Sequence, residues 1–163
     1  MVFELEIKQY LTQTEISKLF EIISRNMSDI GFEIGKKDKS VWEKNLENNL
    51  LRNDFFLFVI YKDGIIVGFI ELGVYDEKLF LSELQLCEQV KNSRILLKTI
   101  QTLMKNDNFE HFNEIYFNIN KNNFKSIKTF EHLGGECIKQ NEKSVCYKIK
   151  RGIIDNYLKK VSR

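Results

Sequence analysis

The sequence predicts an α+β fold with a mixed, mostly antiparallel sheet and a central parallel β-α-β unit. Tight-turn signals at Asp63-Gly64 and at 76–78 join consecutive apolar strands, as in antiparallel hairpins. Further along, an apolar strand at 80–87 is separated from another strand at 114–120 by an amphipathic helix. Strands joined by a helical crossover run parallel, so one parallel pair is expected inside an otherwise antiparallel sheet.

The composition is that of an ordinary globular protein and excludes several function classes. The 163 residues are 43% hydrophobic and 29% charged, which fits one domain over 1–163, with 151–163 as a helical tail. A net charge of +2 gives no strong field for nucleic acid, and the longest apolar run, 55–61, is too short to span a bilayer. The start of the chain shows no signal peptide. We therefore expect a cytoplasmic protein, monomer or homodimer, with no nucleic-acid or membrane partner.

Metal chemistry is not expected either. The three cysteines have no paired spacing, and the two histidines have no ligand partner at metal spacing. We interpret the cysteines as reduced structural thiols.

The first 50 residues predict a strand followed by two helices. Alternation over 3–7 indicates a half-buried strand. A Thr-x-x-Glu capping box at Thr12 and Glu15 opens an amphipathic helix, and a second box at Ser40 and Glu43 predicts the next helix.

The segment 28–39 between these helices contains two glycines and predicts a loop. Phe32 and Ile34 lie in it. Apolar residues in such a loop either line a substrate pocket or tuck into the core.

Three strands follow, and the third leads into a possible anion site. The run 55–61 is almost uniformly apolar, as in a strand covered on both faces, and 65–75 returns as its partner. Gly68 and Gly73 in that return predict a bulge or a close backbone approach. After the strand 80–87, a polar turn at 88–93 precedes a helix from Arg94. A strand that runs into a helix N-terminus presents unpaired N–H groups, which suit a phosphate, although a plain βα unit of the core explains the same pattern.

The remainder alternates strands and helices. A strand at 114–120 is followed by a helix over 123–133 that ends at Gly134-Gly135. Segments 137–140 and 145–149 predict a closing hairpin, and the tail from Gly152 predicts a short amphipathic helix that packs back on the domain.

Three segments in this order resemble the GNAT superfamily, the acyl-CoA-dependent N-acetyltransferases. DFFLFVIYKDGIIVGFIEL is similar to the second and third strands of the family. SELQLCEQVKNSRILLKTIQTLM is similar to its cofactor strand, phosphate loop and helix, and NKNNFKSIKTFEHLGGE to its N-x-x-S/A-x-x-x-Y-x-x-x-G segment. The resemblance implies helices on both faces of the sheet, acetyl-CoA as co-substrate, and acetyl transfer to a primary amine of a small molecule or peptide.

The resemblance also implies which residues contact the cofactor, with two departures from the family pattern. The glycines of the phosphate loop are replaced by Arg94 and Leu96, so backbone N–H groups have less freedom to approach a pyrophosphate, and polar side chains would have to compensate. Phe130 stands where many relatives carry the tyrosine that protonates the leaving thiolate, and it equally fits a core position. The implied cofactor-binding residues are Leu84, Gln85, Leu86, Lys91, Asn92, Ser93, Arg94, Ile95, Asn123, Ser126 and Phe130.

In the mechanism that the resemblance implies, a carboxylate takes the proton of the attacking amine. Glu83 on the cofactor strand is the preferred base and Glu71 the second choice, although either could be a plain strand residue. A backbone N–H between Leu84 and Leu86 would hold the oxyanion. Two other function classes remain open, which are a non-catalytic acyl-CoA-binding or sensing protein and an interaction module that has lost the cofactor.

Overall fold

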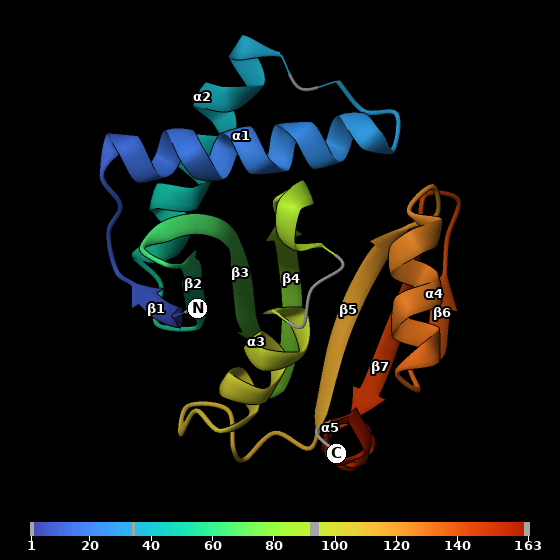
Figure 1. The fold of residues 1–163 in the computed structure, drawn as a ribbon. Coiled ribbons are helices and arrows are strands. Elements are labelled where there is room, and N and C mark those ends of the chain that lie inside the picture. The colour runs from blue at the N-terminus through green and yellow to red at the C-terminus, as the bar shows by residue number, and fades with distance from the viewer. Residues whose placement is uncertain (1, 34, 92–94, 162–163) are drawn as a thin grey trace. The chain divides into compact units, whose positions relative to one another are not determined.

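The computed structural model describes residues 2–33, 35–91 and 95–161, and Figure 1 labels its helices and strands. Predicted site residues Ile34, Asn92, Ser93 and Arg94 lie outside the described residues. The elements in chain order are β1 (Phe3–Lys8), α1 (Gln13–Asp29), α2 (Lys36–Leu50), β2 (Phe55–Lys62), β3 (Ile65–Tyr75), β4 (Lys78–Leu86), the short 3-10 helix η1 (Glu88–Val90), α3 (Ile95–Met104), β5 (Glu114–Asn120), α4 (Phe124–His132), β6 (Glu136–Gln140), β7 (Ser144–Lys150) and α5 (Arg151–Val161).

The strands form one mixed sheet, which confirms the predicted fold class. The hydrogen-bonded order is β1-β2-β3-β4-β5-β7-β6, and the pair β4–β5 is parallel. The chain divides into two compact units that share strands β3 and β4. The first unit comprises Met1–Gly73 and Glu83–Ile95, and the second comprises Val74–Ser82 and Leu96–Arg163.

In the first unit, α1 begins where the sequence predicts and α2 begins earlier. The Thr12 hydroxyl accepts from the N–H of Glu15, and the Glu15 carboxylate accepts from the N–H of Thr12, so both parts of the capping box are present. The second predicted box is wrong. Gly35 is the N-cap of α2, and its N–H donates to the Asp38 carboxylate at 2.8 Å, which places Ser40 inside the helix. The Asp38 carboxylate accepts from the backbone N–H of the N-cap residue, as the glutamate of a Ser-x-x-Glu capping box does.

The predicted hairpins of β2, β3 and β4 are present. Asp63 and Gly64 both have positive φ, as do Asp76 and Glu77, which is the backbone of tight two-residue turns. The β2–β3 register shifts after Ile60, which confirms the bulge predicted near Gly68. A Cβ on Gly68 would lie 2.4 Å from the carbonyl oxygen of Gln85, so this glycine lets β3 approach the end of β4.

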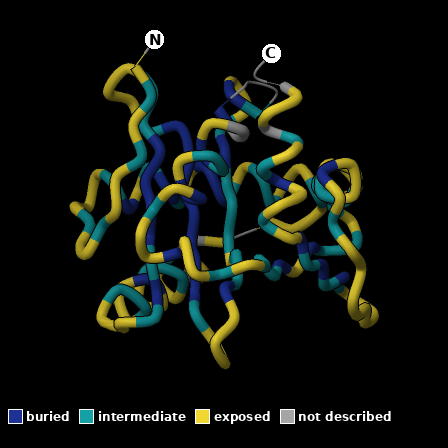
Figure 2. Tube along the Cα trace, turned by 90° about the horizontal axis from the view of Figure 1, so that it is seen from below, coloured by how far each residue is buried: buried dark blue, intermediate teal, exposed yellow. Residues whose placement is uncertain are grey.

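The first unit has an apolar core under α1 and α2. The Trp42 ring contacts Phe20 and Phe69, with centroids 5.5 and 6.3 Å away. Burying one such side chain stabilises the fold by about 1.5–3 kcal/mol. Figure 2 shows the buried stretches in dark blue and the exposed turns in yellow. The buried members of this cluster are Leu19, Ile23, Leu46, Phe55, Leu57, Val59 and Phe69.

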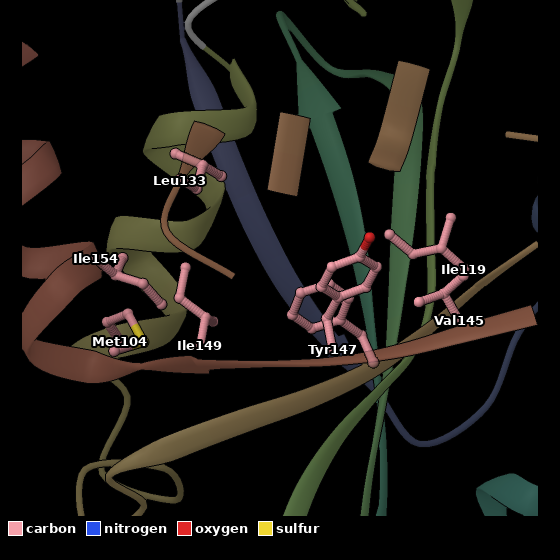
Figure 3. Packing of buried hydrophobic residues seen from close by; sticks show 8 residues of the cluster. Met104, Ile119, Leu133, Val145, Tyr147, Ile149 and Ile154 are labelled. Atoms are coloured by element: carbon pink, nitrogen blue, oxygen red, sulfur yellow. The ribbon is translucent and has the colours of Figure 1, made fainter. Parts of the chain in front are cut away.

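The second unit packs its own core between strands and the C-terminal helices. Ile154 of α5 is buried in it, as expected for a tail that packs back on the domain (Figure 3). At the end of α4, Gly134 has φ +90°, and the Gly135 N–H donates to the Phe130 carbonyl at 2.8 Å, so the predicted glycine stop is confirmed. The buried members of this core are Met104, Phe117, Ile119, Leu133, Val145, Tyr147, Ile149 and Ile154.

Candidate active site

The end of strand β4 carries four of the predicted site residues, which are Glu83, Leu84, Gln85 and Leu86. The parallel ladder between β4 and β5 covers three residue pairs, from Leu79–Ile115 to Leu81–Phe117. Strand β4 nevertheless continues to Leu86. The backbone groups of 83–86 therefore take no part in that ladder, and they include the N–H groups predicted to hold an oxyanion.

The two predicted catalytic carboxyl groups lie close together in the first unit. The Glu71 side chain, on β3, is only 8% exposed, and Glu83, on β4, is half-buried. Burial and then the charge of Glu83 raise the pKa of Glu71 to about 8. Burial also raises the pKa of Glu83, while a hydrogen bond from Gln85 opposes this rise. The pair resists losing both protons at neutral pH because two nearby charges in a poorly solvated site repel each other.

A short chain of side-chain amides leads to Glu83. The Gln85 amide nitrogen donates to the Glu83 carboxylate at 2.7 Å. The Asn26 amide nitrogen, from α1, donates to Gln85 Oε1 at 2.8 Å and to the carbonyl oxygen of Leu86 at 3.0 Å. Asn26 is not among the site residues predicted from the sequence, although the pattern of α1 indicates its position. Asn26 follows Ile22 and Ile23 at helical spacing, so it is a polar residue on the buried face of α1.

The loop after β4 does not present a free lysine. Lys91 Nζ lies 2.8 Å from a Glu88 carboxylate oxygen and 3.2 Å from one of Asp29 on α1. Burial lowers the pKa of Lys91, but these two carboxylates outweigh it and raise the pKa. Helix α3 starts at Ile95, which is 1% exposed, and no acidic residue lies in its first turn. The first turn of α3 thus contains no acidic residue that would repel an anion.

In the second unit, helix α4 carries the last group of predicted cofactor residues. Asn123 is the N-cap of the helix, and its side-chain oxygen accepts from the N–H of Ser126 at 3.1 Å. The Phe130 ring lies 4.2 Å from the Phe117 ring, centroid to centroid, and packs against the core of the unit together with Ile127. A capping role for Asn123 and a core role for Phe130 are therefore present, and their contact with a cofactor stays a prediction.

The remaining expectations concern the loop after α1, metal and membrane. The loop is shorter than predicted because α1 runs to Asp29 and α2 starts at Lys36. Within it Phe32 is 40% exposed, and its contact with a substrate stays a prediction. Over the part of the chain that the structure describes, no three His, Cys, Asp or Glu side chains gather to hold a metal ion. In the same part, no helix is long and apolar enough to cross a membrane.

Comparison with solved structures identifies the fold. FdhC in its apo form, a nucleotide-linked sugar GNAT, superposes with a TM-score of 0.74 at 14% identity, covering 99% of this chain and 93% of its own. PaiA N-acetyltransferase from Thermoplasma acidophilum, in complex with coenzyme A, gives 0.68 at 18% identity, covering 90% and 99%. PseH N-acetyltransferase from Campylobacter jejuni, in complex with acetyl coenzyme A, gives 0.63 at 16% identity, covering 92% and 99%.

Sequence comparison alone finds nothing, since no protein-family model and no curated protein matches the chain. The similarity to solved structures nevertheless spans almost the whole chain. The chain therefore has the GNAT fold.

Proposed function

From this GNAT fold, we propose that the chain is an N-acetyltransferase that moves an acetyl group from acetyl-CoA to a primary amine. The observation that carries the proposal is that Glu71 on β3 interacts with Glu83 near the end of β4, and that burial raises the pKa of both carboxyl groups. A carboxyl group whose pKa is raised toward neutral pH suits a general base. Glu83 belongs to the stretch 83–86, whose backbone groups take no part in the β4–β5 ladder.

The reaction is a direct displacement at the thioester carbonyl. The amine nitrogen forms a bond to the carbonyl carbon, and the carbon–sulfur bond breaks with its electrons going to the thiolate of coenzyme A. The amine gives its proton to Glu83. The negative charge that develops on the carbonyl oxygen is held by a backbone N–H between Leu84 and Leu86, which needs no particular side chain.

Glu83 serves as the base and Glu71 keeps the shared proton. Gln85 donates a hydrogen bond to the Glu83 carboxylate, which favours its charged form. Among the described residues, Glu71 has no such donor, and burial is the largest cause of its raised pKa. Of the two carboxyl groups, Glu83 is therefore the one that gives up its proton more readily, and as a carboxylate it can accept a proton from the amine.

The residues present fit acetyl-CoA in part. Those N–H groups of 83–86 that point away from β3 take no part in the β4–β5 ladder and suit the polar atoms of an extended arm, and the acid-free first turn of α3 suits a phosphate. Lys91 is compensated by Asp29 and Glu88, so it would have to exchange these partners for a pyrophosphate. The proposal therefore assigns most of the phosphate binding to Asn92, Ser93 and Arg94.

A second candidate function is a non-catalytic acyl-CoA-binding protein. The observation that favours it is Phe130, which packs against the core and offers no hydroxyl to protonate a thiolate. A thiol pKa near ~8.5 makes thiolate a tolerable leaving group without such an acid, and we therefore place the transferase first. If Phe130 faces the thiol, Phe130→Tyr speeds turnover with an amine.

Thermal unfolding with acetyl-CoA tests the proposal. A ligand that binds the folded state at 100 times its Kd stabilises it by about 2.7 kcal/mol, which is several degrees in Tm for a chain of this size. We expect such a rise, and we expect Arg94→Glu to remove it, with Lys44→Glu as the control charge reversal at an exposed position of α2. Release of free thiol with a panel of primary amines then separates the transferase from the binding protein. No thermal shift in the wild type contradicts both functions.

A further inference from the structure

We infer that Asn26 of helix α1 is a positioning residue for the proposed base Glu83, acting through the amide of Gln85. This role rests on the proposed function, because it concerns the residue that takes the amine's proton. It is carried by three hydrogen bonds within the first unit, which run from Asn26 to the Leu86 carbonyl, from Asn26 to Gln85, and from Gln85 to Glu83.

The direction of these hydrogen bonds follows from the Leu86 carbonyl. A carbonyl oxygen only accepts, so the Asn26 amide must turn its NH₂ group toward Leu86, at 3.0 Å. The second hydrogen of the same NH₂ group then meets Gln85 Oε1, at 2.8 Å. With its oxygen occupied, the Gln85 amide has its own NH₂ group aimed at Glu83, at 2.7 Å.

This polarity selects the protonation state of the base. An NH₂ group aimed at a carboxyl favours the charged carboxylate, and such charge-assisted hydrogen bonds are the stronger ones. If the Gln85 amide were reversed, its oxygen would face Glu83 and favour the protonated, catalytically inert form. Asn26 therefore keeps Glu83 able to accept a proton.

Among the described residues, Glu71 from β3 is the charged group that is known to act on the pair, since its carboxyl interacts with Glu83. On α1 and in the loop after β4, Asp29 and Glu88 both pair with Lys91. The hydrogen bonds from Asn26 and Gln85, which are uncharged side chains, thus influence the protonation of Glu83.

The test compares three variants by a readout that needs no substrate. Glutamate side chains are labelled with ¹³C, and the carboxyl titration of Glu83, assigned with Glu83→Gln, is followed by NMR. In Asn26→Leu, Glu83 should titrate at higher pH than in the wild type, because the Gln85 amide is no longer held. Turnover at a pH below the titration should fall about tenfold and recover at high pH. Asn48→Leu, at an exposed position of α2, should change neither property.

A double variant separates positioning from helix docking. If Asn26 acts through Gln85, Asn26→Leu combined with Gln85→Leu titrates like Gln85→Leu alone, whereas a role in docking α1 gives additive effects. Should Asn26→Leu unfold, Asn26→Asp offers a second route, since the new carboxylate attracts the Gln85 NH₂ group and reverses the amide. An unchanged Glu83 titration, or additive effects, overturns the positioning role. Absence of acetyl transfer by the wild type overturns the proposed function and leaves the titration result standing.

Discussion

At the scale of single residues, the proposed chemistry depends on two carboxyl groups that interact in a poorly solvated site. Glu71 is almost fully buried and Glu83 half-buried, and both have a raised pKa. Their roles differ because Gln85 donates to Glu83 alone. Substituting either glutamate with glutamine keeps the shape of the side chain and removes its charge. The first prediction below concerns turnover, and the second concerns stability.

The first prediction concerns turnover. Glu83→Gln should lower turnover on the order of 100-fold or more, because a general base typically contributes at least that factor, while the affinity for acetyl-CoA stays nearly unchanged. The pH–rate profile should also lose its acidic limb. Glu47→Gln, an exposed position on α2, is the matched control. Full activity of Glu83→Gln across the pH range would show that Glu83 is a plain strand residue and would make Glu71→Gln the next variant.

The second prediction concerns stability and pH. The pKa of Glu71 rises from an ordinary 4.5 to about 8 on folding, so the carboxyl is protonated in both states below 4.5. Above that pH the unfolded chain loses the proton first, and the stability contributed by protonated Glu71 is lost as pH rises through about 8. Glu71→Gln should therefore raise the free energy of unfolding at pH 9 by on the order of 2–4 kcal/mol and leave it nearly unchanged at pH 4.

Urea unfolding at pH 4, 7 and 9 measures this difference. Glu47→Gln again serves as the control, since an exposed carboxyl should show no such dependence. A constant difference between Glu71→Gln and the wild type at all three pH values would contradict the raised pKa of Glu71.

At the scale of elements, the end of β4 is shaped by the strand beside it. Gly68 in β3 leaves room for the Gln85 carbonyl, and the Cys87 N–H donates to the Val67 carbonyl at 2.8 Å. On the other side, Asn26 of α1 holds the Leu86 carbonyl. The backbone of 83–87 is therefore held from two neighbouring elements, which gives the proposed oxyanion site a defined geometry.

The third prediction follows from this close approach. Gly68→Ala would place a Cβ 2.4 Å from the Gln85 carbonyl oxygen, so β3 and β4 must move apart. We expect a loss of about 1–3 kcal/mol in stability and a larger loss of turnover than stability alone explains. The control is Gly152→Ala in α5, where a Cβ meets nothing within 4 Å and no loss is expected. Equal behaviour of the two variants in urea unfolding and thiol release would contradict the role of Gly68.

At the scale of the whole molecule, two units are built from interrupted segments of one chain. The first unit takes 1–73 and 83–95, and the second takes 74–82 and 96–163, so β3 and β4 each cross from one unit to the other. If one unit unfolded alone, each of these strands would have to be part folded and part unfolded. The units should therefore behave as one cooperative domain, as the length of the chain also predicts.

The fourth prediction is a single unfolding transition. Calorimetry should give a van't Hoff enthalpy equal to the calorimetric one, and tryptophan fluorescence should follow the same curve as circular dichroism. The fluorescence reports the first unit, since the only tryptophan, Trp42, packs in its core. Two separated transitions, or a fluorescence midpoint that differs from the circular-dichroism midpoint, would contradict cooperative unfolding.

Local patterns in the sequence determined the elements and their order. The period-2 runs, the Thr12 capping box, the Asp63-Gly64 turn and the Gly134 stop each depend on neighbouring residues, and each is present. The parallel pair β4–β5 also followed from a helix between two strands. The predicted start of α2 was wrong because the helix begins after Gly35, whose N–H donates to the Asp38 carboxylate, and a glycine N-cap has no side chain that marks its position in the sequence.

Only the tertiary structure decided the environment of the candidate site. The pKa values of Glu71 and Glu83 depend on burial and on their proximity, and these residues are separated in sequence by a hairpin. Asn26 reaches Gln85 from 59 positions away, and the partners of Lys91 include Asp29, 62 positions away. Protonation and hydrogen bonding depend on groups that are close in the folded structure. The spacing of residues in a single sequence does not reveal contacts between residues so far apart in the chain.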